Sequence, residues 1–274
     1  MGDVSDDRVY DDDGPASTAY LGTVDGVVTL DVSTDRIGRF ALEHSAVVRD
    51  LAVVDDRVVV ATAEDVVVLS DGATATGFGE AIAVGGSDTI LAAGPEGRIA
   101  RLSDGVWSTV GDLQDVRSMA GPYVGTGDGV YRAGDCLAYE GLVGANALAA
   151  PDPGWAGTHE GLYRIADQGY EHDGVIRAVA AAGDAVHAAT AEAVFERDPE
   201  GSGGPSAWTD LDPPTEAPIA ALAHGPRGPD GQRTLLGVTV DGVAVLRPAA
   251  SADGGDEWRR RTLGFEGIAG LVVA

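Results

Sequence analysis

Lysine is absent from this 274-residue chain, whose 18 basic residues are all arginine against 44 Asp and Glu, for a net charge of −26. Such a chain lacks the basic face that direct binding to bare nucleic acid normally needs. Dense negative charge repels itself in dilute buffer, but at 1 M salt the screening length falls to about 3 Å. We therefore expect a halophilic, archaeal protein of a salt-rich cytoplasm, with an acidic mimic of nucleic acid as the alternative.

Other absences narrow the class further. The single cysteine, Cys136, cannot form an internal disulfide, and a chain of this length can bury enough surface to fold without one. No run of 18 apolar residues is present, so no membrane span is expected. Residues 1–14 hold six Asp and no apolar run, which does not fit a signal peptide. A cytoplasmic location is expected.

A repeated word is the main positive feature. It consists of a small residue, Thr or a similar residue, any residue, an acid, usually Gly, and then three apolar or Arg positions. Seven copies place their acids at Asp25, Glu64, Glu96, Asp128, Glu160, Glu192 and Asp241. Four successive intervals between these acids are 32 residues long. A fixed period of this kind indicates a repeat architecture.

Each copy predicts the same local structure. An acid followed by Gly between two apolar runs predicts a β-hairpin, because Gly adopts the positive φ of a tight turn. A short apolar run lies upstream, and a further predicted strand downstream often carries an aromatic residue: Phe40, Phe78, Trp107, Tyr139, Tyr170, Trp208 or Trp258. Four short strands per repeat of about 32 residues predict one propeller blade. The chain is therefore predicted to be an all-β, seven-bladed β-propeller.

The two ends of the sequence predict how the ring closes. The first copy, at Gly22, lacks an upstream inner strand, and residues 268–274 form a strand-like run without a hairpin. We expect residues 268–274 to pair beside Ala19–Thr23, with residues 1–17 as a disordered acidic tail and residues 18–274 as one propeller domain. Three segments rich in Gly, Pro, Asp and Ser are expected as loops on the face opposite the acidic turns: Asp198–Ser206, Gly225–Arg233 and Pro248–Glu257.

The Gly-Thr-x-Asp/Glu-Gly-apolar-Tyr-Arg words at Gly125 and Gly157 resemble the repeats of sialidase-like and related assembly-factor propellers. The whole chain, with its acidity, resembles a haloarchaeal β-propeller family. This resemblance covers residues 19–274 and implies the fold. Sialidases use a tyrosine nucleophile, an acid and an arginine cluster, which cannot be placed in this sequence, and residues 103–107 match only part of the Asp-box word.

The seven repeat acids form the first candidate site. Each belongs to the turn between the second and third strands of its blade, so all are expected on one face. A crown of carboxylates could bind cations or a basic partner. The alternative is turn chemistry, because Asp favours tight turns, on a surface that is acidic throughout.

The second candidate site is the mouth of the central channel. Alignment of the inner strands places Arg49, Arg117, Asn146 and Arg177 at equivalent positions on the acidic-turn face. The planar guanidinium group suits carboxylates and phosphates. These four residues predict an anion or acidic-peptide pocket. Alternatively, the arginines form structural ion pairs with the acidic turns or with Asp50 and Asp115.

No motif assigns a reaction, and no catalytic residue is predicted. His44, His159, His172, His187 and His224 fall at spacings that do not suit a metal site, so neither a metal nor a cofactor is expected. We expect a monomeric, non-enzymatic platform that binds a protein partner. Two alternatives remain: a hydrolase or lyase that acts on an anionic substrate at the channel mouth, and a metal-dependent lactonase-like propeller.

Overall fold

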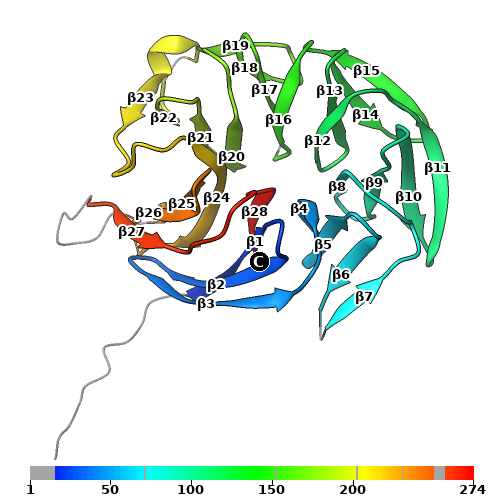
Figure 1. Ribbon diagram of the computed structural model, residues 1–274. Helices are drawn as coiled ribbons and strands as arrows, with labels where there is room; N and C mark the ends of the chain where they lie inside the picture. Colours follow the sequence, from blue (N-terminus) through cyan, green and yellow to red (C-terminus); the bar gives the residue numbers. More distant parts are fainter. Residues whose placement is uncertain (1–15, 71, 152, 202, 230, 250–256) are drawn as a thin grey trace, which may run out of the picture.

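Seven four-stranded antiparallel sheets radiate around a central axis in the computed structural model (Figure 1). The structure describes residues 16–249 and 257–274, except residues 71, 152, 202 and 230. We number the blades 1 to 7 in chain order. The prediction of an all-β, seven-bladed propeller is confirmed.

Each blade contributes one strand at each of four positions, from the innermost to the outermost, and each set runs from blade 1 to blade 7. The innermost strands are β28 (Gly270–Val273), β4 (Val48–Val54), β8 (Ala83–Gly85), β12 (Val116–Ala120), β16 (Ala145–Ala149), β20 (Ala178–Ala182) and β24 (Ile219–Arg227). The second strands are β1 (Ala16–Gly22), β5 (Arg57–Thr62), β9 (Leu91–Ala93), β13 (Tyr123–Thr126), β17 (Trp155–Thr158), β21 (Ala185–Ala189) and β25 (Arg233–Thr239).

The outer half of each blade completes the sheet. The third strands are β2 (Val27–Ser33), β6 (Val66–Leu69), β10 (Arg98–Ser103), β14 (Val130–Ala133), β18 (Gly161–Arg164), β22 (Val194–Arg197) and β26 (Val243–Arg247). The outermost strands are β3 (Ile37–His44), β7 (Ala73–Ala75), β11 (Val106–Asp112), β15 (Leu137–Gly141), β19 (Tyr170–Asp173), β23 (Trp208–Leu211) and β27 (Arg259–Thr262). A 3-10 helix, η1 (Pro205–Ala207), precedes β23.

The C-terminal strand closes the ring in blade 1, as predicted. Strand β28 pairs antiparallel with β1, with Leu21 opposite Leu271 and Ala19 opposite Val273. The pairing continues beyond the strand, because the N–H of Ala274 donates to the carbonyl of Thr18 at 3.0 Å. Closure therefore gives blade 1 its inner strand. It also covers a strand edge that could otherwise pair with other chains.

The core lies between the blades. The buried apolar residues of the described chain fall into seven clusters, one at each interface between neighbouring blades. The small residue that begins each repeat faces the next blade. A Cβ on Gly22 would lie 2.6 Å from Leu51, and one on Gly157 would lie 2.5 Å from Ile176. Adjacent blades therefore pack closely because the repeat begins with a small residue.

Some local expectations were wrong. Phe78 and Trp258 lie in connecting segments rather than in outer strands, and Phe78 is buried against Trp107 in the core between blades 2 and 3. Strand β24 continues through Arg227, across part of the segment Gly225–Arg233 expected as a loop. Its cross-strand pairing with β25 holds the extra residues extended.

The ends of the predicted domain are partly outside the described residues. Strand β1 begins at Ala16, two residues inside the predicted tail, and residues 1–15 of that tail lie outside the described residues. Most of the predicted loop Pro248–Glu257 also lies outside them. None of the described residues form a helix long and apolar enough to cross a membrane.

Candidate functional site

One face of the ring carries the turns between second and third strands, and we call it the acidic-turn face. The seven repeat acids are all exposed there: Asp25, Glu64, Glu96, Asp128, Glu160, Glu192 and Asp241. The start of each inner strand reaches the same face, because the N–H of Val48 donates to Thr23 O at 3.1 Å and that of Ile176 donates to Thr158 O at 3.0 Å. The channel mouth and the acidic turns thus share one face.

In five of the seven turns, the threonine of the repeat rather than its acid makes the hydrogen bonds within the turn, whereas in blade 7 the hydroxyl of Thr239 also donates to its acid, Asp241. The hydroxyl of Thr126 accepts from the N–H groups of Asp128 and Gly129 and donates to the carbonyl of Gly129. Thr23, Thr62, Thr158 and Thr190 make the same contacts in their turns. This local side-chain to backbone bonding leaves the acidic side chains at the solvent.

The inner-strand residues aligned in the sequence occupy one structural position. Arg49, Arg117, Asn146 and Ala220 each lie where the pairing register of an inner strand shifts, one residue after its start. Arg177 lies directly before β20 and donates its N–H to Ala189 O at 2.8 Å. A β-bulge changes the direction of the extra side chain. The same irregularity recurs in these inner strands at the channel mouth.

Two of the three arginines at this position are paired with carboxylates. Arg49 Nη2 lies 2.7 Å from Glu80 Oε1, in the connection before β8. Arg117 Nη2 lies 2.6 Å from Asp115 Oδ2, and its Nη1 donates to Asn146 Oδ1 at 3.0 Å. These ion pairs are substantially exposed, so each contributes little to stability.

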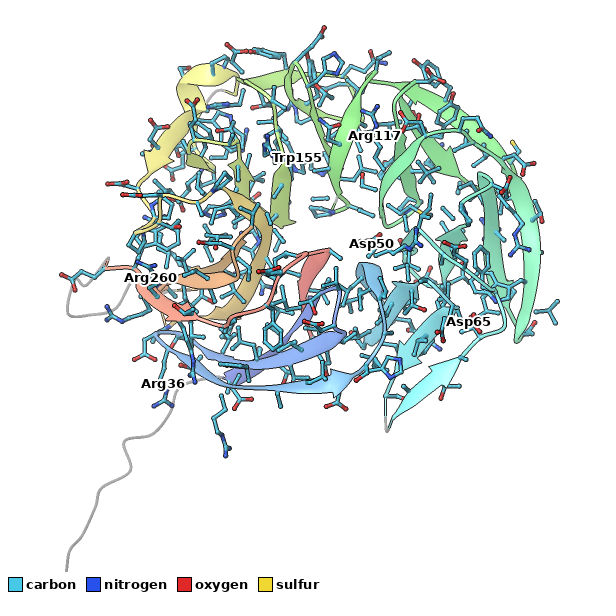
Figure 2. All side chains as sticks on the ribbon, in the orientation of Figure 1. Arg36, Asp50, Asp65, Arg117, Trp155 and Arg260 are labelled. Carbon is cyan, nitrogen blue, oxygen red and sulfur yellow. The ribbon has the colours of Figure 1, made fainter. Side chains whose placement is uncertain are left out.

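Asp50 is not a partner of these arginines. It lies toward the centre of the ring (Figure 2), and its carboxylate accepts from the N–H groups of Leu51 at 2.9 Å and Val84 at 3.0 Å. Burial raises the pKa of Asp50 to about 7, although the two backbone hydrogen bonds act to lower it. Asp50 therefore links the inner strands of blades 2 and 3.

Arg177 differs from the other two arginines. Its side chain is exposed and has no hydrogen bond or ion pair with any described residue. It lines a cavity of about 390 Å³ between the inner strands of blades 5, 6 and 7. The lining residues are Asn146, Val175, Ile176, Arg177, Ile219, Ala220 and Val240. Within the predicted site, the structure brings Asn146 and Arg177 into this cavity and places Arg49 and Arg117 outside it.

Five half-exposed valines lie in connections of the acidic-turn face. Nine large apolar side chains are strongly exposed among the described residues, and five of them are valines in the connections of the acidic-turn face: Val24, Val47, Val143, Val175 and Val240. Sequence reasoning missed them, because a single valine in a connection carries no periodic signal. Val24 and Val240 do occupy the unspecified third position of the repeat, at the tip of its turn, where a side chain is exposed.

The opposite face holds a buried polar network that the sequence did not reveal. His187 Nδ1 and His224 Nε2 are 2.9 Å apart across the interface of blades 6 and 7. His187 Nε2 lies 3.5 Å from Glu196 Oε1, and Arg247 Nη1 lies 2.6 Å from Glu196 Oε2. The one available signal was His187 itself, a polar residue at a repeat position that is apolar or aromatic in the other blades.

This network shifts two pKa values. The hydrogen bond from His187 and the neighbouring Arg247 lower the pKa of Glu196 to about 2. Burial, reinforced by the charges of His187 and Arg233, lowers the pKa of His224 to about 3. The ionised Glu196 accepts a hydrogen bond from Nε2–H of His187, and in that neutral tautomer Nδ1 of His187 accepts from Nε2–H of His224.

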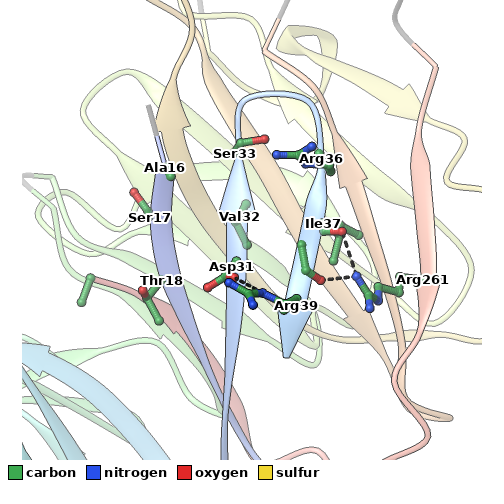
Figure 3. Close-up of a pocket in the computed structure, with 12 residues that line it drawn as sticks. Ala16, Ser17, Thr18, Asp31, Val32, Ser33, Arg36, Ile37, Arg39 and Arg261 are labelled. Carbon is green, nitrogen blue, oxygen red and sulfur yellow. Dashed lines mark hydrogen bonds and ion pairs between the residues drawn. The ribbon is translucent and has the colours of Figure 1, made fainter. Parts of the chain in front are cut away.

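A second hollow, with a volume of about 700 Å³, lies on blade 1 where β1 and β3 begin and β2 and β28 end (Figure 3). Arg261 crosses from blade 7 and donates to the carbonyls of Ile37 and Gly38, so its guanidinium group joins two blades. Arg39 is almost fully exposed and only 3.9 Å from Asp31. In this hollow Arg261 therefore has a structural role, and Arg39 is held only loosely.

The described part of the chain offers no cluster of metal-ligating side chains. No group of three or more His, Cys, Asp and Glu side chains there could hold a metal ion. The carboxylates beside the channel arginines, Glu80 and Asp115, are exposed rather than deep in a pocket. General acid or base catalysis uses a group whose pKa is tuned by its surroundings, and neither carboxylate is enclosed in this way.

Comparisons with known structures give the fold alone. The computationally designed Ika8 protein is 18% identical, with a TM-score of 0.59, over 91% of this chain and 85% of that one. The Pan2 WD40 domain of Neurospora crassa is 13% identical over 93% of this chain and 81% of that one, with a TM-score of 0.43. The extracellular domain of the putative one component system BT4673 from B. thetaiotaomicron is 11% identical over 91% of this chain and 46% of that one, with a TM-score of 0.48.

Sequence comparison identifies the family. No curated protein is significantly similar to the chain. A family model described as "Beta-prop_HVO_0234:-like, beta propeller" matches residues 3–274. Since that match spans almost the entire chain, the protein belongs to this β-propeller family.

Proposed function

We propose that this propeller is a non-enzymatic platform of a halophilic cytoplasm that docks a protein partner on its acidic-turn face. The observation that carries the proposal is the set of exposed valines in the connections of the acidic-turn face. Exposed apolar surface on one face of a protein favours contact with a partner. The cavity beside Val175 and Val240 adds a recess into which a partner side chain can insert.

The expected solvent supports the same face. A net charge of −26 carried without lysine suits molar salt. In that solvent, charges more than about 3 Å apart are screened, whereas burial of apolar surface still stabilises a complex. A partner recognised there has to rely on apolar contacts and on short, direct ion pairs. The exposed valines and the unpaired Arg177 provide these two kinds of contact.

The enzymatic alternatives have less support. A hydrolase or lyase for an anionic substrate needs an enclosed acid or base that can reach the substrate next to the arginines. Glu80 and Asp115 are exposed, and both oxygens of the buried Asp50 are occupied by the N–H groups of Leu51 and Val84. A lactonase-like metal site needs several oxygen ligands that converge on one point, and the described residues offer no such group.

The proposal is tested by affinity purification in molar KCl with a Val24→Asp/Val47→Asp/Val143→Asp variant. These valines are about half exposed, so the variant should keep its fold. The control is Val106→Asp, at the β10–β11 turn on the opposite face, where the residue is 67% exposed. We expect one stoichiometric partner with the wild type and the control, and its loss with the triple variant.

Two results would contradict the platform. One is a partner that remains bound to the folded triple variant. The other is the absence of any partner together with turnover of an anionic substrate by the purified protein. Circular dichroism and thermal melting of each variant separate a lost interface from a lost fold.

A further inference from the structure

The cavity between blades 5, 6 and 7 has one charged group and otherwise aliphatic walls. Its polar groups are the guanidinium of Arg177 and the side-chain amide of Asn146, and no carboxylate lines it. Val175, Ala220 and Val240 are among the residues that form the apolar wall. A ligand that matches this lining has a small aliphatic body and a negatively charged end.

The amide of Asn146 is oriented by its neighbours. Asp115 holds the guanidinium of Arg117, and Arg117 in turn donates to Asn146 Oδ1 at 3.0 Å. Because the amide oxygen is occupied by that donor, the NH₂ group of Asn146 is the part left to bind a ligand. Arg177 adds a guanidinium group without any partner among the described residues. The cavity therefore presents hydrogen-bond donors from two blades.

The charge of the cavity selects the kind of anion. A single guanidinium group matches the single charge and planar shape of a carboxylate, with which it forms two parallel hydrogen bonds. A phosphate dianion carries a second charge that the single guanidinium group does not match. A volume of about 390 Å³ is small for a drug-sized ligand, at the low end for ligand pockets, and suits one or two small residues.

We infer that this cavity binds the C-terminal carboxylate of a partner polypeptide that ends in a small aliphatic residue. A chain end carries the carboxylate and the aliphatic side chain on the same residue, as the lining demands. An internal Asp or Glu would bring a polar side chain and two flanking peptide groups into the apolar recess. This inference rests on the proposed platform function, and it names the part of the partner that enters the channel mouth.

The test measures peptide binding to the full chain in molar KCl by isothermal titration calorimetry. The probes are N-acetyl-Gly-Val-Val with a free carboxylate, the same peptide as its C-terminal amide, and isovalerate. We expect the free acid to bind, and the amide to bind about 10- to 100-fold more weakly, since a charge-assisted hydrogen bond contributes about 1.5–3 kcal/mol.

Variants locate the binding. Arg177→Gln should weaken binding of the free acid by a similar factor, and Asn146→Asp should abolish it by adding a like charge. Arg57→Gln is the matched control, because Arg57 is a half-exposed arginine at the start of β5 on the opposite face. Equal binding of acid and amide, or an unchanged affinity of Arg177→Gln, would overturn the inference.

The remaining outcomes separate the inference from the platform. If isovalerate binds as tightly as the peptide, the site takes a free small acid and the polypeptide assignment is wrong. If no probe binds while the triple valine variant still loses its partner, the carboxylate site fails and the platform stands. Loss of peptide binding in the triple valine variant is not expected, since none of those three valines lines the cavity.

Discussion

The two faces of the propeller use their polar side chains differently. On the acidic-turn face, arginines pair with exposed carboxylates or, at Arg177, with no described residue, and valines lie open to solvent. On the opposite face, Glu171 is 1% exposed and lies 3.1 Å from Arg164 Nε and 3.6 Å from Arg197 Nε. The backbone N–H of Gly204 also donates to this carboxylate at 3.1 Å.

The difference teaches which contacts hold the ring together. The charged groups of the opposite face cross from one blade to the next: Glu171 to Arg197 between blades 5 and 6, and Glu196 to Arg247 between blades 6 and 7. On the acidic-turn face, threonine hydroxyls and backbone hydrogen bonds hold the turns. Contacts between blades also occur on the acidic-turn face, where Arg117 donates to Asn146 and Asp50 accepts from Val84. The faces therefore differ in exposure, because the arginine ion pairs of the acidic-turn face are open to solvent, whereas Glu171 is buried in a blade interface.

Removal of strand β28 should have the largest effect, since both faces depend on ring closure. Leu271 and Val272 pack in the two core clusters on either side of blade 1. Deletion of residues 270–274 should abolish cooperative unfolding, because the loss of two packed interfaces exceeds the total stability of about 5–15 kcal/mol typical of a domain. Thermal melting in molar KCl checks this. Deletion of residues 1–15 is the comparison, with a melting temperature expected within a few degrees of the wild type.

A truncated protein that still melts in one sharp transition near the wild-type temperature would contradict this expectation. It would mean that the ring tolerates an open blade. The difference between the two faces would then not depend on closure of the ring.

The second prediction compares one carboxylate from each face. Glu171→Gln removes the charge between two arginines and should lower the free energy of unfolding by about 2–3 kcal/mol, because breaking a buried ion pair leaves an uncompensated charge. Glu80→Gln removes the partner of Arg49 at an exposed site and should cost less than about 1 kcal/mol. Urea unfolding of both variants in the same salt measures the difference. Equal losses would show that the faces do not differ in this respect.

The repeat made the architecture predictable. The 32-residue spacing and the acid-Gly hairpins predict the number of blades. The inner strand that the first repeat lacks predicts closure of the ring by the C-terminal strand. The same alignment placed Arg49, Arg117 and Asn146 at one position of the inner strands, because a repeat preserves register from blade to blade. Periodic features were therefore accessible from the sequence.

Contacts between blades were not predictable in the same way. Arg49 pairs with Glu80 rather than Asp50, and Glu80 belongs to the connection between β7 and β8, whose backbone N–H groups at residues 77–79 donate to Asp65. His187 and His224 meet across two blades although they are 37 residues apart. Such pairings depend on how the sheets pack side by side, which the repeat does not encode. The role of the repeat threonine was also missed, because its hydroxyl acts on backbone groups within the turn.

The smallest effect is expected from pH, acting on the histidine pair of the opposite face. His224 has a folded-state pKa of about 3, lowered by burial and by the charges of His187, Arg233 and Arg227, whereas an exposed histidine has a pKa near 6.5. Below pH 6.5 the unfolded chain binds a proton that the folded chain does not, so stability falls as the pH falls. By pH 5 this contribution should reach about 1–2 kcal/mol. Glu196 does not add to the loss in that range, because its lowered pKa acts only below its ordinary value near 4.5.

The variant His224→Gln isolates this contribution. Glutamine retains an N–H donor for His187 and does not titrate, so the variant should lose less stability than the wild type between pH 7 and pH 5. Urea unfolding at pH 7, 6 and 5 in molar KCl measures both slopes. Parallel slopes would show that His224 is protonated equally in the folded and unfolded states. Burial in the network of the opposite face would then not disfavour the charged form of His224.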